Sequence, residues 1–382
     1  EGQAGRLGEC MTAVVVDGQL GKEYRLPTVL ESLKEASAEG RLDSVFAEIP
    51  FGVPSEPTPK AGIGASRAFS VDGYGFDRWE KLFLRRQLLA VGNFVLLVRR
   101  AAEQLKRDCD TVWAEAILAG LATTIDKLVD RSCSLCRWDQ GYTKVHSTFA
   151  RFALPILWDF CEGNPLSETT GNYRSAVEWV AMVLGENGKA ANGQPPPSVM
   201  LLSAVHNGKS GLHDAIITDP PYYDAIPYSD LMDFFYIWLR RTLHELSPEF
   251  TEVFKEPLSP KWDHEKSDGE LIDDAGRFDG NKDVSKQNYE DGMARVFVAC
   301  HQALRAEGRL VIVFANKQPD AWETLVSGII RAGFVVDGSW PIATEMQNRT
   351  RALSSAALSS SVWLVCKKRN PVARPGWDNV VL

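Results

Sequence analysis

The chain has 382 residues, of which 45% are hydrophobic and 24% are charged, and its formal net charge is −8. This composition is typical of a globular protein with two or three domains, and the acidic balance excludes a passive nucleic-acid coat, which needs a broadly basic surface. No apolar run reaches membrane-spanning length, and residues 1–5 lack the pattern that opens a signal peptide, so we expect no membrane contact and a cytoplasmic location.

Residues 1–75 have the pattern of a tail from an upstream region followed by a linker. We expect a strand over 11–16 and a helix over 28–39. Residues 50–75 are rich in Pro and Gly, which is typical of a linker or a long loop.

Residues 76–190 are predicted to form a helical domain, because apolar residues recur there at three- and four-residue spacing. The predicted helices cover 82–105, 112–129, 149–160 and 176–184. A second break follows over 187–198, where three prolines stand in a row.

Residues 191–382 alternate between short apolar runs and amphipathic stretches, which predicts strands alternating with helices. Strands are expected over 199–202, 214–218, 308–315, 334–340 and 361–366, and helices over 228–243, 286–305 and 320–332. The charged segment 256–284 is expected to form a mobile loop. The alternation predicts a parallel, doubly wound sheet, and the last strand is expected to be antiparallel because no helix precedes it.

The seven cysteines are an odd and scattered set, which suggests reduced thiols. Cys133 and Cys136 form a CxxC motif, but a structural zinc site needs a second pair of ligands at suitable spacing, and the sequence holds none. We therefore expect no bound metal.

The motif Asp219-Pro220-Pro221-Tyr222 follows directly on the predicted strand 214–218. In an open α/β sheet, ligands bind beyond the carboxyl ends of the strands. The two prolines fix φ and remove two backbone donors, which leaves a stiff loop that presents carbonyls and a carboxylate. Such a loop is suited to hold an exocyclic amine by its N–H groups.

The amine of adenine or cytosine is a poor nucleophile, because its lone pair is delocalised into the ring. If Asp219 and the Pro220 carbonyl accept its two hydrogens, the nitrogen becomes pyramidal and its lone pair is free for in-line attack on a methyl sulfonium. The base must be flipped out of the duplex to reach the loop. Tyr222 is predicted to stack on it, and Tyr223 and Tyr228 add aromatic surface.

This motif, placed after a strand, resembles the hallmark of amino-group DNA methyltransferases. The longer stretch 217–241 (ITDPPYYDAIPYSDLMDFFYIWLRR) is similar to the large adenine-specific DNA methylases that carry an internal zinc ribbon and an N-terminal domain of unknown function. Further similar segments, at 24–27, 82–89, 135–138, 158–165 and 359–366, extend the resemblance over nearly the whole chain.

The resemblance implies an α/β fold in which part of a class I, Rossmann-like methyltransferase sheet is joined to an additional helical domain. It implies a site-specific enzyme that methylates adenine in DNA with S-adenosyl-L-methionine (AdoMet) as methyl donor. Restriction-modification and phage defence are both settings in which such enzymes act.

Enzymes of this kind carry a glycine-rich AdoMet loop and the zinc ribbon upstream of the matching region, and neither is present in this sequence. The closest segment, 159–165, lacks the glycine pair and reads equally as a helix end. The resemblance thus implies a C-terminal portion whose partner is the upstream part of the same enzyme.

Four residues are candidates for cofactor contact. Ser203 and Ala204 follow the strand before the motif, a position near the AdoMet adenine in related folds, although an ordinary strand end explains them equally. Phe83 lies in a segment similar to a Phe-Thr-Pro motif that touches the methionine end of AdoMet. Asn316, followed by Lys317, ends the next strand at the same sheet edge, where a helix cap is the alternative.

Two other functions remain open from the sequence. One is methylation of another amino group, on cytosine N4, RNA or a protein glutamine amide. Cytosine enzymes often carry Ser in place of Asp219, and glutamine enzymes usually carry Asn, so Asp favours adenine. The other is a DNA-binding or specificity module that keeps the motif without catalysis.

Overall fold

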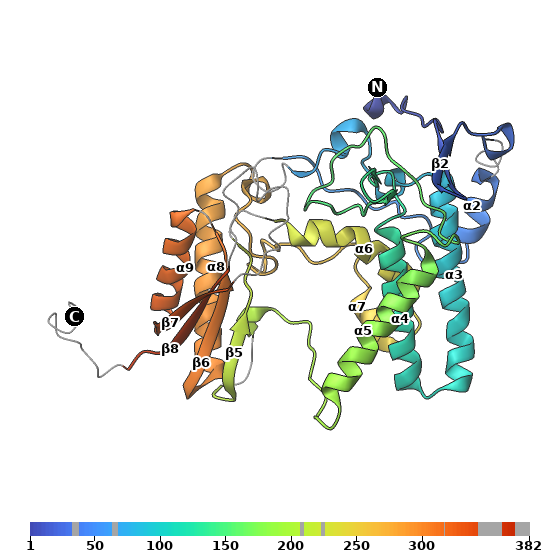
Figure 1. The fold of residues 1–382 in the computed structure, drawn as a ribbon. Helices are drawn as coiled ribbons and strands as arrows, with labels where there is room; N and C mark the ends of the chain where they lie inside the picture. The colour runs from blue at the N-terminus through green and yellow to red at the C-terminus, as the bar shows by residue number, and fades with distance from the viewer. Residues whose placement is uncertain are drawn as a thin grey trace. The chain divides into compact units, whose positions relative to one another are not determined.

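A computed structural model describes residues 1–32, 38–62, 68–206, 210–222, 226–316, 318–342 and 361–370 (Figure 1). The chain is a mixed α/β protein that divides into two compact units. The helical unit holds the described residues of 1–62, 66–197 and 228–260, and the sheet unit holds those of 198–227 and 261–382. None of the helices in the described part of the chain has the length and apolar character needed to cross a bilayer.

The helical unit is built from helices and two small hairpins. The helices are α2 (Glu39–Phe46), α3 (Arg85–Asp108), α4 (Thr111–Val129), α5 (Tyr173–Ala191), α6 (Tyr228–Leu243) and α7 (Pro248–Val253). The hairpins pair β1 (Val14–Gly18) with β2 (Gly21–Arg25) and β3 (Trp138–Asp139) with β4 (Lys144–Val145). Asp110 and Asn172 cap α4 and α5 by accepting a backbone N–H two or three residues into each helix.

The helix predicted over 149–160 is wrong, since the structure has turns, bends and two isolated β-bridges there. Leu154 pairs with the segment before α3: its N–H donates to the Ala68 carbonyl, and its own carbonyl accepts from Ser70, both at 3.1 Å. Pro155 follows, and a proline inside a helix would remove a donor and clash with the preceding turn. The apolar spacing over this stretch therefore reflects packing of an irregular segment.

The helical unit includes α6 in its core, which differs from the expected boundaries of 76–190 and 191–382. The Phe234 ring lies 6.0 Å from that of Trp79 and 5.2 Å from that of Phe149. Both Phe234 and Trp238 of α6 are fully buried. Residues 1–62 also belong to this unit instead of forming a separate tail.

A buried arginine fastens the Pro- and Gly-rich segment after α2 to the end of α6. Arg241 has no exposed side-chain surface, and its two terminal nitrogens each lie 2.9 Å from a carboxylate oxygen of Glu56. Its Nε donates to the Gly52 carbonyl at 2.7 Å. One side chain thus organises a segment that would otherwise lack regular hydrogen bonds.

The sheet unit contains a four-stranded mixed sheet in the order β5-β6-β8-β7. Its strands are β5 (His213–Thr218), β6 (Leu304–Phe314), β7 (Phe334–Ile342) and β8 (Ser361–Lys368), and its longer helices are α8 (Lys282–Ala303) and α9 (Pro319–Arg331). β5 is parallel to β6, and β8 is antiparallel to both of its neighbours, which confirms the prediction of an antiparallel last strand. The strand predicted over 199–202 is not formed, and its four apolar side chains are exposed.

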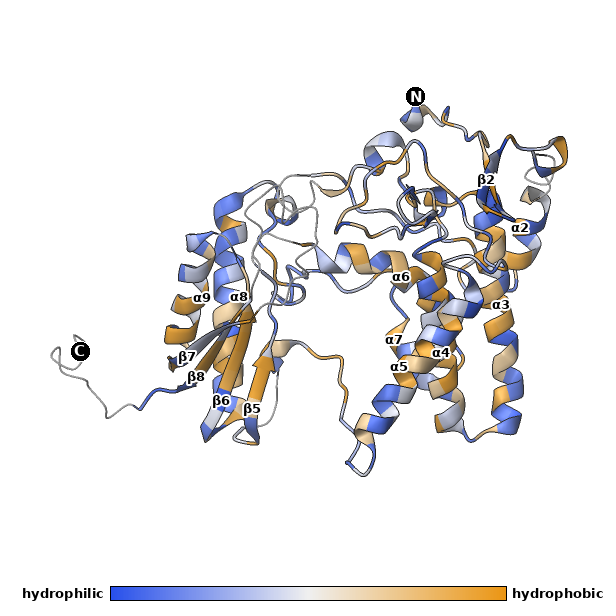
Figure 2. Cartoon of the chain, in the orientation of Figure 1, coloured by the Kyte–Doolittle hydropathy of each residue, from blue (hydrophilic) through white to orange (hydrophobic). Residues whose placement is uncertain are grey.

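One face of this sheet is covered by helices of the same unit. Leu310, Ile312 and Phe314 of β6 are buried in a core shared with α8 and α9. β5 and much of β6 are apolar, as their orange colour in Figure 2 shows. On the opposite face Ile217 is 67% exposed and Trp340 is 55% exposed. β5 is also an edge strand of the sheet within the described residues.

The segment 256–284 is irregular, as expected, but much of it is packed. Ile272 and Ala275 are buried. Among the described residues of 256–281, the only helical element is the short 3-10 turn η6 (Ala275–Phe278). The Ser259 hydroxyl donates to Asp233 at 2.6 Å, and Gly292 of α8 leaves room for the Leu271 side chain. These contacts count against an unpacked loop.

Candidate active site

The Asp219–Tyr222 motif lies at the carboxyl end of β5, directly after Thr218. The parallel register pairs Thr218 with Ile312, so β5 and β6 end at the same edge of the sheet. Asn316 follows the end of β6 and reaches the motif at this edge. The motif therefore occupies the position at which open α/β sheets bind ligands.

Two side chains outside the motif hold its backbone. The Tyr289 hydroxyl of α8 donates to the Pro221 carbonyl at 2.7 Å, and the Asn316 amide donates to the Tyr222 carbonyl at 3.2 Å. Asn316 is itself fixed, because its Oδ1 accepts from the Gln318 N–H and its carbonyl accepts from the Trp322 indole, both at 2.9 Å. The loop is thus tied to both neighbouring elements.

Within the motif, Tyr222 orients Asp219. The Tyr222 hydroxyl donates to Asp219 Oδ1 at 2.6 Å, and its ring packs edge-on against Phe314 at 5.6 Å. Asp219 is exposed. Neither its second carboxylate oxygen nor the Pro220 carbonyl has a hydrogen-bond partner among the described residues. Two acceptors on one stiff loop are therefore available to a ligand.

The aromatic residues predicted to surround the base are placed differently. Tyr222 is half-buried against the core of the sheet unit, so its hydroxyl and not an open ring face is its clearest contribution. Tyr228 begins α6 in the helical unit and is 44% exposed. Tyr223 and Lys317 lie outside the described residues.

Ser203 and Ala204 lie at a 3-10 turn, η5 (Ala204–His206), in the sheet unit. The Ser203 hydroxyl donates to Asp268 Oδ1 at 2.7 Å. The other oxygen of that carboxylate lies 3.8 Å from His206 Nδ1. Ser203 thus serves an internal contact, and Ala204 is exposed.

Phe83 is a core residue of the helical unit. Its side chain is buried, stacked on Phe234 at 5.8 Å and in edge contact with Trp238 at 5.4 Å. Because these rings cover it, it has no free face for a cofactor, and packing alone accounts for it.

The four candidate cofactor residues come from two units, Phe83 from the helical unit and the other three from the sheet unit. The polar atoms of Ser203 and Asn316 are bonded within the protein, Phe83 is covered, and Ala204 offers only a methyl group. Across the residues that the structure describes, no group of three His, Cys, Asp or Glu side chains is arranged to hold a metal.

The CxxC pair is a buried feature of the helical unit. The Cys133 and Cys136 sulfurs lie 4.0 Å apart, and the Thr148 hydroxyl is 3.1 Å and 3.5 Å from them. Burial raises the pKa of the Cys133 thiol, so it stays protonated at neutral pH. A buried, protonated thiol is a packing residue and a poor nucleophile.

Sequence reasoning did not single out Tyr289 or Trp322, although both fix the candidate site. Tyr289 contacts a residue 68 positions earlier in the chain, and helical spacing marks it only as a buried position of α8. Trp322 was similarly just one apolar residue of α9.

No family model matches the chain, and no curated protein or solved structure matches it either.

Proposed function

We propose that the chain forms the target-base part of an AdoMet-dependent DNA methyltransferase, which transfers a methyl group to the exocyclic N6 amine of a flipped-out adenine. The observation that supports this most is a pair of acceptors, Asp219 Oδ2 and the Pro220 carbonyl, that no described residue engages, on an anchored loop at the carboxyl end of β5. An exocyclic amine has two hydrogens and needs two such acceptors.

In this proposal the loop acts by position and charge. Asp219 and the Pro220 carbonyl each accept one N–H of the amine, which directs the nitrogen lone pair away from the ring. Tyr222 keeps the carboxylate oriented through Oδ1, while Tyr289 and Asn316 prevent the backbone from moving. Preorganised acceptors of this kind need no rearrangement at the moment of reaction.

In this proposal the methyl donor is held with the help of residues from elsewhere, since Phe83 is covered by other rings and Ser203 and Asn316 already bond within the protein. The resemblance implies that an upstream part of the same enzyme supplies a glycine-rich loop for AdoMet. We expect weak or no AdoMet binding by this chain alone, and restored binding by a polypeptide extended upstream. Calorimetric titration of both measures this, and micromolar binding by the chain alone would make 159–165 the leading candidate for a divergent loop.

The proposed activity is tested with the upstream-extended enzyme, AdoMet and duplex DNA. Mass spectrometry of the digested DNA identifies the modified nucleoside, and N6-methyladenine is the expected product. N4-methylcytosine would instead show a cytosine enzyme. DNA binding without any methylated base, in a protein that binds AdoMet, would show a specificity module without catalysis.

A further inference from the structure

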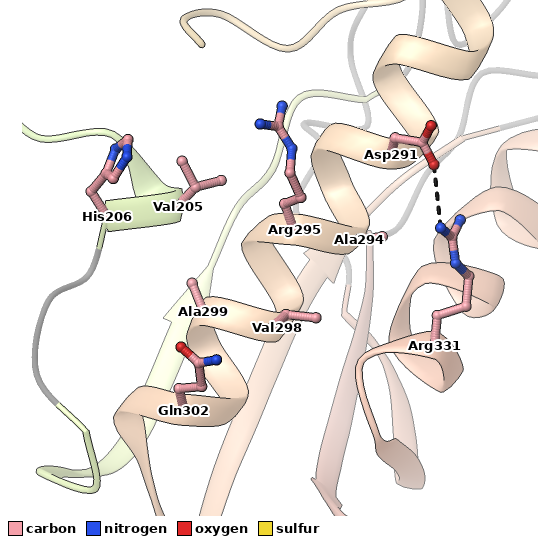
Figure 3. Close-up of a pocket in the computed structure, with 9 residues that line it drawn as sticks. All are labelled: Val205, His206, Asp291, Ala294, Arg295, Val298, Ala299, Gln302 and Arg331. Carbon is pink, nitrogen blue, oxygen red and sulfur yellow. Dashed lines mark hydrogen bonds and ion pairs between the residues drawn. The ribbon is translucent and has the colours of Figure 1, made fainter. Parts of the chain in front are cut away.

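A pocket of about 630 Å³ lies in the sheet unit, on the side of α8 that faces away from the sheet core (Figure 3). From α8 it is lined by Asp291, Ala294, Arg295, Val298, Ala299 and Gln302, and from other elements by Val205, His206 and Arg331. The Asp219–Tyr222 loop (DPPY in one-letter code, and called the DPPY loop below) does not line this pocket. Its volume is in the range of small-molecule sites.

Arg295 is a cation of this pocket whose charge, after the Gln287 hydrogen bond and the contacts of Arg331, contributes to the lowered pKa of Asp291. Its side chain extends into the space between α8 and η5 (Figure 3), where Nη2 donates to the Ser267 carbonyl at 3.0 Å. It forms no ion pair within the described residues, whereas Arg331 lies 3.2 Å from Asp291. An arginine with one backbone bond keeps several N–H donors for an anion, and its planar fork matches phosphate oxygens.

His206 lies across the pocket from α8 and is held by Asp268 at 3.8 Å (Figure 3). Between His206 and α8 the walls are small and apolar, formed by Val205 and Ala299. Gln302, one turn beyond Ala299 on α8, adds an amide at the far end. The pocket therefore combines a cationic arginine with an apolar slot and several polar side chains, among them Gln302 and the Asp291–Arg331 pair.

We propose that this pocket binds a nucleotide unit, with its phosphate on Arg295 and its base between Val205 and Ala299. A free nucleotide and a nucleotide within a DNA strand share this chemistry. Only the second source rests on the proposed function, because a DNA methyltransferase must hold its substrate backbone away from the target base.

Isothermal titration calorimetry of the full chain with AMP, adenosine and a single-stranded DNA decamer tests the proposal. We expect saturable AMP binding, weaker binding of adenosine, and a loss of at least tenfold in AMP affinity in Arg295→Gln. Val205→Asp, which adds a negative charge to the slot, should weaken AMP binding as well. Arg107→Gln removes the same charge from the exposed surface of α3 and should leave AMP affinity unchanged.

The decamer shows whether the pocket takes a free nucleotide or a nucleotide within a DNA strand. Parallel losses for decamer and AMP in Arg295→Gln assign the site to a DNA strand, and loss for AMP alone assigns it to a free nucleotide. The proposal fails if AMP shows no saturable binding, or if Arg295→Gln and Arg107→Gln bind it equally while both keep the wild-type circular dichroism. The assay contains no methyl transfer, so this failure would leave the proposed function untouched.

Discussion

At the DPPY loop, the Asp219 carboxylate combines exposure with a fixed orientation. Tyr222 donates to one of its oxygens, and two prolines stiffen the backbone that follows it. Such a side chain contributes little to the core, so its replacement should affect chemistry far more than folding.

We predict that Asp219→Ala abolishes methyl transfer in the upstream-extended enzyme while its thermal unfolding is unchanged. Asp214→Ala is the matched control, since Asp214 is an exposed carboxylate at the start of the same strand, paired with exposed Arg305. Product formation is measured with AdoMet and duplex DNA. Activity retained above about a tenth of wild type, a loss of only about 1.4 kcal/mol, would rule out the proposed role.

Tyr289→Phe should loosen the loop without touching the reacting groups. It leaves the Pro221 carbonyl without its 2.7 Å hydrogen bond, which costs about 1–3 kcal/mol for a buried group. As Tyr289 is a positioning residue, kcat should fall while KM for DNA stays near wild type. A rise in the KM for DNA with an unchanged kcat would instead indicate that Tyr289 supports DNA binding.

Asp126 in α4 is half-buried, and its Oδ1 is a buried atom that has no hydrogen-bond partner among the described residues. Burial raises its pKa well above the ordinary value. The folded state therefore keeps its proton at pH values where the unfolded state has lost it, so this group lowers stability progressively as pH rises above about 4.

Asp126→Asn should remove this pH dependence and stabilise the helical unit at pH 7. The measurement is urea unfolding at pH 5 and pH 7, followed by circular dichroism. Wild type should lose more stability than the variant between these values. An identical pH dependence in both proteins would show that Asp126 is solvated and ionised in the folded state.

Among the elements, those with complete periodic patterns were predicted best. α6 runs from Tyr228 to Leu243 as expected, and β5 and α9 differ from their predicted bounds by one residue at one or both ends. For α9 local spacing is sufficient because the helix buries one face, which includes Ala321, Leu325 and Ile329. The expected helix over 149–160 failed because pairing with the 68–70 segment overrides its spacing, and a tertiary contact of this kind leaves no local pattern.

The candidate site was predictable in part, because some of its features are local in sequence and others depend on long-range contacts. A strand followed by Asp219 and two prolines is visible in the sequence, and the structure places it at the expected sheet edge. The anchoring by Tyr289 is not visible, because it joins a helix to a distant loop. The packing of α6 with residues 1–197 was also not visible, since α6 directly follows the motif in sequence.

The contact between α6 and the segment after α2 gives a prediction at the element scale. Arg241→Met would leave the buried Glu56 with only Arg240, 3.5 Å away, as a cationic partner, and removing one member of a buried ion pair costs up to about 3–5 kcal/mol. Arg100→Met breaks an exposed pair with Glu48 and should cost less than about 1 kcal/mol. Urea unfolding compares the two, and similar losses would argue that water screens the Glu56 pair.

At the scale of the whole molecule, the helical unit is discontinuous in sequence. It is assembled from residues before 198 and from 228–260, and the intervening residues belong to the sheet unit. Phe234 and Trp238, both fully buried, come from the later part.

A polypeptide of residues 1–197 should therefore fail to fold cooperatively. It lacks the two rings that fill its core and the partner of Glu56, and cores with large missing side chains lose several kcal/mol. Near-UV circular dichroism should show no fixed tertiary packing, and adding a separate 228–260 peptide should restore part of the signal. A well-packed 1–197 fragment would contradict this account.

The same discontinuity sets an order on synthesis at the ribosome. β5 leaves the ribosome before α6, and β6, the strand that pairs with it, begins only at Leu304. At about 5–20 residues per second, β5 remains for several seconds without its partner strand. Unpaired apolar strands associate with other chains, so the yield of native protein should depend on holdase chaperones and fall as expression is accelerated.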